Sequence, residues 1–152
     1  MVLRQSCIYG PRQFGCEEQG WVAWLMIAAQ CGRPITIYGD GRQVRDLLHV
    51  ADLLDAFEAA ARNIETAAGS IYNIGGGPAN AVSLVEVLHF IEQQAGVRIH
   101  YRRAEPRPGD QRVYISDIRR AGRELEWGPR IGWKAGLSGL HSWISESRVQ
   151  VQ

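Results

Sequence analysis

Residues 43–54 have the sequence QVRDLLHVADLL, and this stretch carries the two patterns that decide the fold. Gln43 to Leu48 form an extended run in which apolar residues surround a charged pair. From Val50 onward apolar residues recur at helical spacing, and Asp52 falls in the first turn, where a negative charge stabilises the helix dipole. The apolar positions of this helix are Leu53, Leu54, Phe57 and Ala61. A strand followed directly by a helix indicates a chain that mixes both kinds of structure.

Three elements are expected on the N-terminal side of this stretch. A short run of mixed composition predicts a strand over about residues 2–8. Apolar residues spaced i, i+3, i+4 and i+7 from Trp21 predict a helix that stops near Gly32. The β-branched and aromatic run 35–38 predicts a second strand, paired with the run 43–48 across a glycine turn.

On the C-terminal side, residues 70–74 are strand-like, and Ser83 with Glu86 fits a capping box for a helix that ends at Gly96. Further strands are expected over 97–101 and 112–115, and further helices over about 117–125 and through Leu137, Leu140 and Ile144. This alternation predicts an α/β fold, or α+β within this fragment. We expect one domain over residues 1–147 and a tail over residues 148–152.

Composition excludes several classes of function. The formal net charge of +1 gives no overall field to attract nucleic acid. No apolar run is long enough to cross a bilayer, and the N-terminus lacks the apolar region of a signal peptide, so we expect a cytoplasmic location. The spacings of Cys7, Cys16 and Cys31 fit neither a disulfide framework nor a zinc site. The four histidines have no metal-ligand spacing, so no metal site is predicted.

Arginines are the candidate anion-binding residues, because Lys134 is the only lysine among the seventeen basic residues. Genome composition would produce the same bias. Arg45 lies among apolar residues, so its charge needs a partner: Asp46, a distant carboxylate or a ligand phosphate. On spacing alone a structural ion pair is favoured. Arg107 and Asp110 share a proline-stiffened loop that suits either an anion clamp or a solvated charged loop.

Two further stretches have both a structural and a functional interpretation. The glycine run 75–77 lies between a strand and a helix, like a dinucleotide-binding loop, but Asn80 replaces the third glycine, which favours a structural turn. Trp21 and Trp24 follow a polar segment that contains Glu17, Glu18 and Gln19. This arrangement fits a base-stacking or sugar-binding wall, although core packing is the commoner role of an aromatic stripe.

Taken together, these segments resemble the extended short-chain dehydrogenase family of NAD-dependent nucleotide-sugar epimerases and dehydratases. The motifs that carry the resemblance appear in the family's order, at residues 3–13, 44–53, 72–77 and 107–110. Residues 12–14, 19–22, 41–46 and 109–112 are most similar to the CDP-paratose 2-epimerase (CDP-tyvelose epimerase) branch. The resemblance implies the C-terminal, substrate-binding half of such an enzyme, without the N-terminal Rossmann nucleotide-binding units.

The resemblance also implies a role for particular residues. Arg45 and Arg107 would hold the diphosphate of a nucleotide-sugar, a CDP-sugar above all, and Asp110 would contact the ribose or orient Arg107. Gln19, Gly20 and Trp21 would lie beside the nucleotide. Tyr9 and Arg12 would approach the junction of cofactor and substrate.

The chain departs from the family at its catalytic motifs. The residues four positions after each tyrosine are Gln13, Arg42, Gly76, Glu105 and Ile118, so the family's YxxxK motif is missing, and so is a GxxGxxG motif. We therefore assign no catalytic residue, and we expect NAD to belong to the full-length enzyme and not to be bound tightly by this chain, which should be inactive alone. The alternatives are a non-catalytic nucleotide-sugar binding module and a protein-interaction module. In either case the strand at 2–8 has an edge that suits a missing N-terminal part or a second copy.

Overall fold

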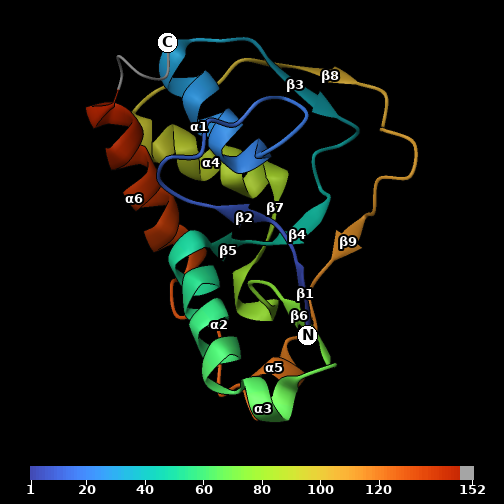
Figure 1. Cartoon of the computed structure of the whole chain (residues 1–152). Helices are drawn as coiled ribbons and strands as arrows, with labels where there is room; N and C mark the ends of the chain where they lie inside the picture. The colour runs from blue at the N-terminus through green and yellow to red at the C-terminus, as the bar shows by residue number, and fades with distance from the viewer. Residues whose placement is uncertain (148–152) are drawn as a thin grey trace.

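The computed structural model describes residues 1–147, and the predicted tail at 148–152 lies outside the described residues (Figure 1). The helices are α1 (Trp21–Cys31), α2 (Val50–Arg62), α3 (Ile64–Ala67), α4 (Leu84–Ala95), α5 (Arg119–Glu124) and α6 (Trp133–Glu146), with a 3₁₀ turn at Pro78–Asn80. The strands are β1 (Val2–Gln5), β2 (Ile8–Tyr9), β3 (Ile35–Tyr38), β4 (Val44–Asp46), β5 (Leu48–His49), β6 (Ile71–Ile74), β7 (Ala81–Ser83), β8 (Tyr101–Ala104) and β9 (Val113–Tyr114). The fold is therefore the mixed α/β structure that the sequence predicts.

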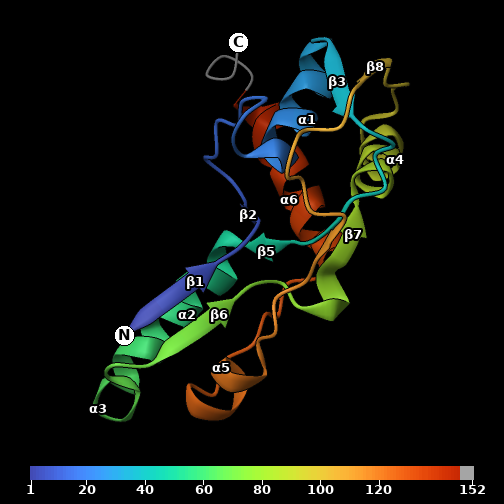
Figure 2. The same ribbon diagram turned by 90° about the vertical axis from the view of Figure 1, so that its right-hand side faces the viewer.

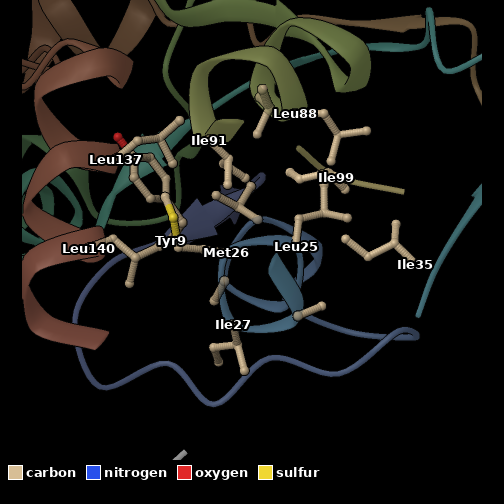
Figure 3. Packing of buried hydrophobic residues seen from close by; sticks show 14 of the residues in the cluster. Tyr9, Leu25, Met26, Ile27, Ile35, Leu88, Ile91, Ile99, Leu137 and Leu140 are labelled. Carbon is tan, nitrogen blue, oxygen red and sulfur yellow. The ribbon is translucent and has the colours of Figure 1, made fainter. Parts of the chain in front are cut away.

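One hydrophobic core lies between α1, α4 and α6. Met26 of α1, Ile91 of α4 and Leu137 of α6 are all fully buried in it. Figure 3 shows these side chains gathered with Tyr9 and Leu140 in one cluster. Because α1 is apolar on nearly every side, it is stable only as a helix covered by its neighbours.

A second core lies between α2, α5 and the parallel pair β1 and β6. Leu53 and Ala56 of α2 are buried there beside Tyr72 and Ile74 of β6. Figure 2 shows this group of elements toward one end of the molecule, with α1, α4 and α6 toward the other. Of the apolar residues that mark this helix in the sequence, Leu53 is buried, whereas Leu54 and Phe57 are 55% and 42% exposed, so the exposed face of α2 is not wholly polar.

The helix signals in the sequence are confirmed. The capping box of Ser83 and Glu86 is present, and its hydrogen bonds lower the pKa of the Glu86 carboxyl. Gly32 and Gly96 end α1 and α4 in the left-handed conformation that glycine adopts without strain. No helix within residues 1–147 is long and apolar enough to cross a membrane.

The strand predicted over residues 2–8 is two strands with different partners. β1 pairs in parallel with β6, whereas β2 pairs in parallel with β5. The chain breaks between them at Cys7, which has a φ of 45°. Such a backbone conformation cannot continue a strand, so the chain changes sheets at this position.

Two further predictions about strands are wrong. The runs 35–38 and 43–48 do not form a hairpin: β3 pairs with β8, and β4 lies between β7 and β9. The expected strand at 97–101 is irregular up to residue 100, and β8 begins only at Tyr101. The alternation there reflects a single anchor, since Ile99 is buried and its amide donates to Glu92 Oε1 at 2.9 Å.

Candidate functional site

A cavity of about 370 Å³ lies where five segments of the chain meet. These are the segment 17–25 at the start of α1, the residues of β3 and β4, Leu84 of α4, and the loop 107–110. Its walls combine aromatic side chains, among them Trp21 and Trp24, with charged groups, among them Arg45 and Arg107. A mostly apolar cavity with a few convergent polar groups is the usual form of a small-molecule site.

Arg45 reaches this cavity from β4, the central strand of its sheet. Its Nη1 donates to the carbonyl oxygen of Val44 at 2.7 Å, and its Nη2 lies 2.6 Å from Asp110 Oδ1. The side chains of Arg45 and Asp110 are 17% and 33% exposed, so the pair is largely but not fully withdrawn from solvent. Of the partners that the sequence left open for Arg45, the structure has the distant carboxylate.

Asp46 points away from Arg45, because successive side chains on a strand face opposite sides. It is fully buried, and its Oδ2 accepts hydrogen bonds from the amides of Gly77 and Ser116, each at 3.0 Å. These two bonds tie β4 to the glycine turn and to the segment that follows β9. The only sign of this role in the sequence is the position of a carboxylate inside an apolar strand, and it was not predicted.

Arg107 lines the same cavity and comes from the loop that also holds Asp110. Its guanidinium carbon is 4.1 Å from the centre of the Tyr38 ring, within the range of a cation–π contact, and its Nη2 is 3.5 Å from the carbonyl oxygen of Glu17. The Tyr38 hydroxyl in turn donates to Glu17 Oε1 at 2.7 Å. Tyr38 was expected only as a strand residue, and nothing in its sequence context predicts these contacts.

The cavity brings together most of the predicted substrate-binding residues, since Gly20, Trp21, Arg45, Arg107 and Asp110 all line it. Gln19 is not among the lining residues. Its backbone closes a turn with Cys16, and its side chain is exposed. Whether these residues bind a nucleotide stays a prediction.

Tyr9 and Arg12, predicted to approach the cofactor, lie outside this cavity. Tyr9 is buried in the first core, its hydroxyl donates to the Trp133 carbonyl at 3.3 Å, and its ring meets the edge of His49. Burial raises the pKa of the Tyr9 hydroxyl above its usual range. Arg12 is exposed, with a φ of 68°. Their role toward a cofactor stays a prediction.

The glycine run 75–77 does not fit a dinucleotide. A Cβ added to Gly75 would lie 2.2 Å from Ser116 Oγ, and one added to Gly76 would lie 2.1 Å from the Leu47 carbonyl oxygen. The glycines are therefore needed because protein atoms fill the space that a side chain would take, as in a structural turn. No group of metal-binding side chains is found in the described part of the chain either.

This fold agrees with what comparison with known proteins finds. Residues 1–75 match the family model described as "NAD dependent epimerase/dehydratase family". These residues therefore form a domain of this family, as the motifs within them predict, and the whole chain is similar to nucleotide-sugar epimerases and dehydratases.

Among curated relatives, the chain is similar to CDP-paratose 2-epimerase of Salmonella typhi, with 34% identity over 95% of this chain and 44% of the relative. It is also similar to dTDP-glucose 4,6-dehydratase of Streptomyces griseus, with 33% identity over 97% of this chain and 43% of the relative. The chain thus spans less than half the length of these relatives.

Solved structures of nucleotide-sugar epimerases are also similar to this chain. UDP-glucose 4-epimerase of Thermotoga maritima, solved with UDP-glucose, superposes with a TM-score of 0.84 at 28% identity, over 97% of this chain and 46% of that one. UDP-glucuronic acid 4-epimerase of Bacillus cereus, solved with UDP-glucuronic acid and NAD, gives 0.84 at 26% identity, over 96% and 45%. The described fold corresponds to the C-terminal half of such enzymes.

Proposed function

We propose that this chain is the substrate-binding portion of an NAD-dependent nucleotide-sugar epimerase that acts on a CDP-hexose, in a 2-epimerisation of the CDP-paratose to CDP-tyvelose type. The observation that carries the proposal is that Arg45 and Arg107, which come from separate elements, line one cavity beside an aromatic wall. Similarity to CDP-paratose 2-epimerase supports the choice of a CDP-sugar.

The two guanidinium groups suit a diphosphate because each can donate two parallel hydrogen bonds to phosphate oxygens. Within residues 1–147, Arg107 contacts the protein through a ring face and one long hydrogen bond to a carbonyl, which leaves most of its donors available to a ligand. Arg45 is held by Asp110, and a bound diphosphate would share or replace that carboxylate. The ion pair therefore orients Arg45 toward the cavity before a ligand arrives.

The cavity itself is tested by pyrophosphate binding to the 152-residue chain, measured by isothermal titration. We expect Arg45→Ala and Arg107→Ala each to weaken binding by at least about tenfold, since each removes a charge-assisted contact. Arg112→Ala is the matched control, because Arg112 is exposed and outside the cavity, with its closest acid, Asp40, at 4.0 Å. Equal affinity of all four proteins would refute the diphosphate site.

The choice of nucleotide is tested by thermal shift with CDP-, UDP-, GDP- and dTDP-sugars. A ligand that binds only the folded state raises the melting temperature. A selective rise with CDP-sugars is the expected result, and a flat response to every nucleotide would contradict the proposal.

We further propose that the hydride-transfer machinery comes from a polypeptide that supplies GxxGxxG and YxxxK, with NAD carrying out the oxidation and reduction. β1 offers an edge for such a part, because β6 is its only strand partner in the described range. Titration of the chain with NAD and an epimerase assay on CDP-hexoses should both give no signal. If the nucleotide-sugar binds and no companion part exists, a non-catalytic binding module is the better description.

A further inference from the structure

The segment that leads into α1 holds one carboxylate, that of Glu17, in a fixed position on the cavity wall. Cys16 and Gln19 exchange two backbone hydrogen bonds, at 2.8 and 3.2 Å, which close the turn containing Glu17. The carbonyl oxygen of Glu17 also faces the Arg107 guanidinium at 3.5 Å. The backbone from which this side chain projects is therefore held on both sides.

The Glu17 side chain is also held in one orientation, through one of its two carboxylate oxygens. Its Oε1 accepts the hydrogen bond from the Tyr38 hydroxyl, at 2.7 Å. Its Oε2 has no hydrogen-bond partner within residues 1–147, and the residue is only partly exposed. A carboxylate that is fixed at one oxygen and open at the other is a preorganised hydrogen-bond acceptor.

The surroundings of Glu17 indicate what kind of group it would accept from. Trp21, Trp24 and Leu25 lie just beyond it in the chain and line the same cavity, and they offer a surface for a flat ring. Under the function proposed above, the two arginines hold the diphosphate, so the nucleobase is the flat ring that remains to be placed. Its polar edge then falls within reach of Glu17.

We infer that the Glu17 carboxylate selects the nucleobase and favours a pyrimidine that carries an exocyclic amine at position 4. Cytosine carries an N4 amine there, which donates to a carboxylate. Uracil and thymine carry the O4 carbonyl at the same place, so that two acceptors would face each other. This inference rests on the proposed function and adds to it the residue that distinguishes cytidine from uridine and thymidine nucleotides.

The neighbouring Glu18 supplies a matched control. It lines the same cavity, but it is exposed and makes no side-chain hydrogen bond in the described part of the chain. Because nothing orients Glu18, its carboxylate should contribute charge without base selection. Replacement of either glutamate by glutamine removes one negative charge, so the two variants differ only in which residue has changed.

The experiment is isothermal titration of the 152-residue chain and its variants with CDP, UDP, dTDP and pyrophosphate. Wild-type protein should bind CDP about tenfold more tightly than UDP or dTDP, the ratio that one hydrogen bond to a charged acceptor supplies. Glu17→Gln should bring this ratio below one, because Tyr38 can still donate to the amide oxygen, and the amide nitrogen that then faces the base donates to O4 of uracil or thymine but not to the cytosine amine. Glu18→Gln should leave the ratio unchanged.

Tyr38→Phe tests the orientation of Glu17 separately. Loss of the hydroxyl frees the carboxylate while its charge stays, so the ratio of CDP to UDP affinity should fall, by less than in Glu17→Gln. Circular dichroism verifies that each variant is folded.

The outcomes separate this inference from the proposed function. If pyrophosphate and all nucleotides fail to bind the wild-type chain, the diphosphate site itself is absent and both proposals are wrong. If pyrophosphate binds but CDP and UDP bind equally, the diphosphate site stands, whereas the inference about Glu17 and the choice of a CDP-sugar are both overturned. If Glu17→Gln keeps the wild-type ratio, or if Glu18→Gln removes it, only the inference about Glu17 is overturned.

Discussion

Asp46 gives the sharpest prediction about the structure of the site. Its Oδ2 accepts two buried amide hydrogen bonds, from Gly77 and Ser116, while its Oδ1 has no partner among the described side chains and backbone. These contacts fix β4, which carries Arg45, against the segment after β9, to which the loop with Arg107 leads. Replacement by alanine removes the acceptor and leaves both amides buried and unpaired.

The expected cost follows from those two amides. An unpaired buried donor destabilises the folded state by about 1–3 kcal/mol. Removal of a buried charge offsets part of this loss, because that charge no longer has to be kept from water. We therefore expect Asp46→Ala to lower the free energy of unfolding by about 2–4 kcal/mol. Asp46→Asn keeps one carbonyl oxygen as acceptor and should cost only about 1 kcal/mol.

Urea denaturation followed by circular dichroism measures these differences. Asp55→Ala is the control, because Asp55 is an exposed residue of α2 and its replacement should stay within about 0.5 kcal/mol of the wild type. If Asp46→Ala unfolds at the wild-type urea concentration, the two amides find other acceptors and Asp46 does not hold the site together. An equal loss in the alanine and asparagine variants would instead assign the effect to the charge.

Three further predictions concern local features of the fold. Burial lowers the pKa of the His49 imidazole below its ordinary value, so as the pH falls the unfolded state binds a proton at this residue before the folded state does. The contribution of His49 to stability should therefore be complete above about pH 6.5 and decline below it, and the midpoint of urea unfolding should fall less with pH in His49→Asn. Ser83→Ala removes the capping box of α4 and should cost about 1 kcal/mol in thermal unfolding; a melting temperature identical to the wild type would contradict this. Gly76→Ala brings a methyl group to 2.1 Å from the Leu47 carbonyl oxygen and should lower the free energy of unfolding by at least about 1–3 kcal/mol. Gly139→Ala, in open space on α6, should raise it by about 0.5–1 kcal/mol, and equal effects of the two substitutions would show that the backbone at Gly76 can move.

The helices were predictable because their signals are local. Apolar spacing and terminal residues placed α1, α2 and α4 close to their observed bounds, and the capping box at Ser83 was found from two residues alone. The strands were harder, since a short extended run looks the same whichever partner it takes. β3 was assigned to the nearby β4 and instead pairs with β8, where Ile35 lies beside Tyr101.

In the candidate site, too, single residues were predictable from the sequence, whereas the contacts between them were not. The sequence singled out Arg45, Arg107 and Asp110, and all three line one cavity. It did not show that Arg45 pairs with Asp110, which is 65 positions away, or that Tyr38 connects Arg107 to Glu17. Contacts between such distant positions leave no pattern in one sequence, because nothing in the local spacing depends on them.

The sequence by itself determined the family, the mixed α/β class and the arginines suited to bind an anion. These follow from residue types and short spacings, which act within a few turns of the chain. Only the tertiary structure decided which strands pair, which carboxylate holds Arg45, and that one oxygen of Glu17, a residue that lines the cavity, has no hydrogen-bond partner within residues 1–147. The physical reason is that burial and hydrogen-bond partners are properties of the packed molecule, which no stretch of the chain has before the stretches meet.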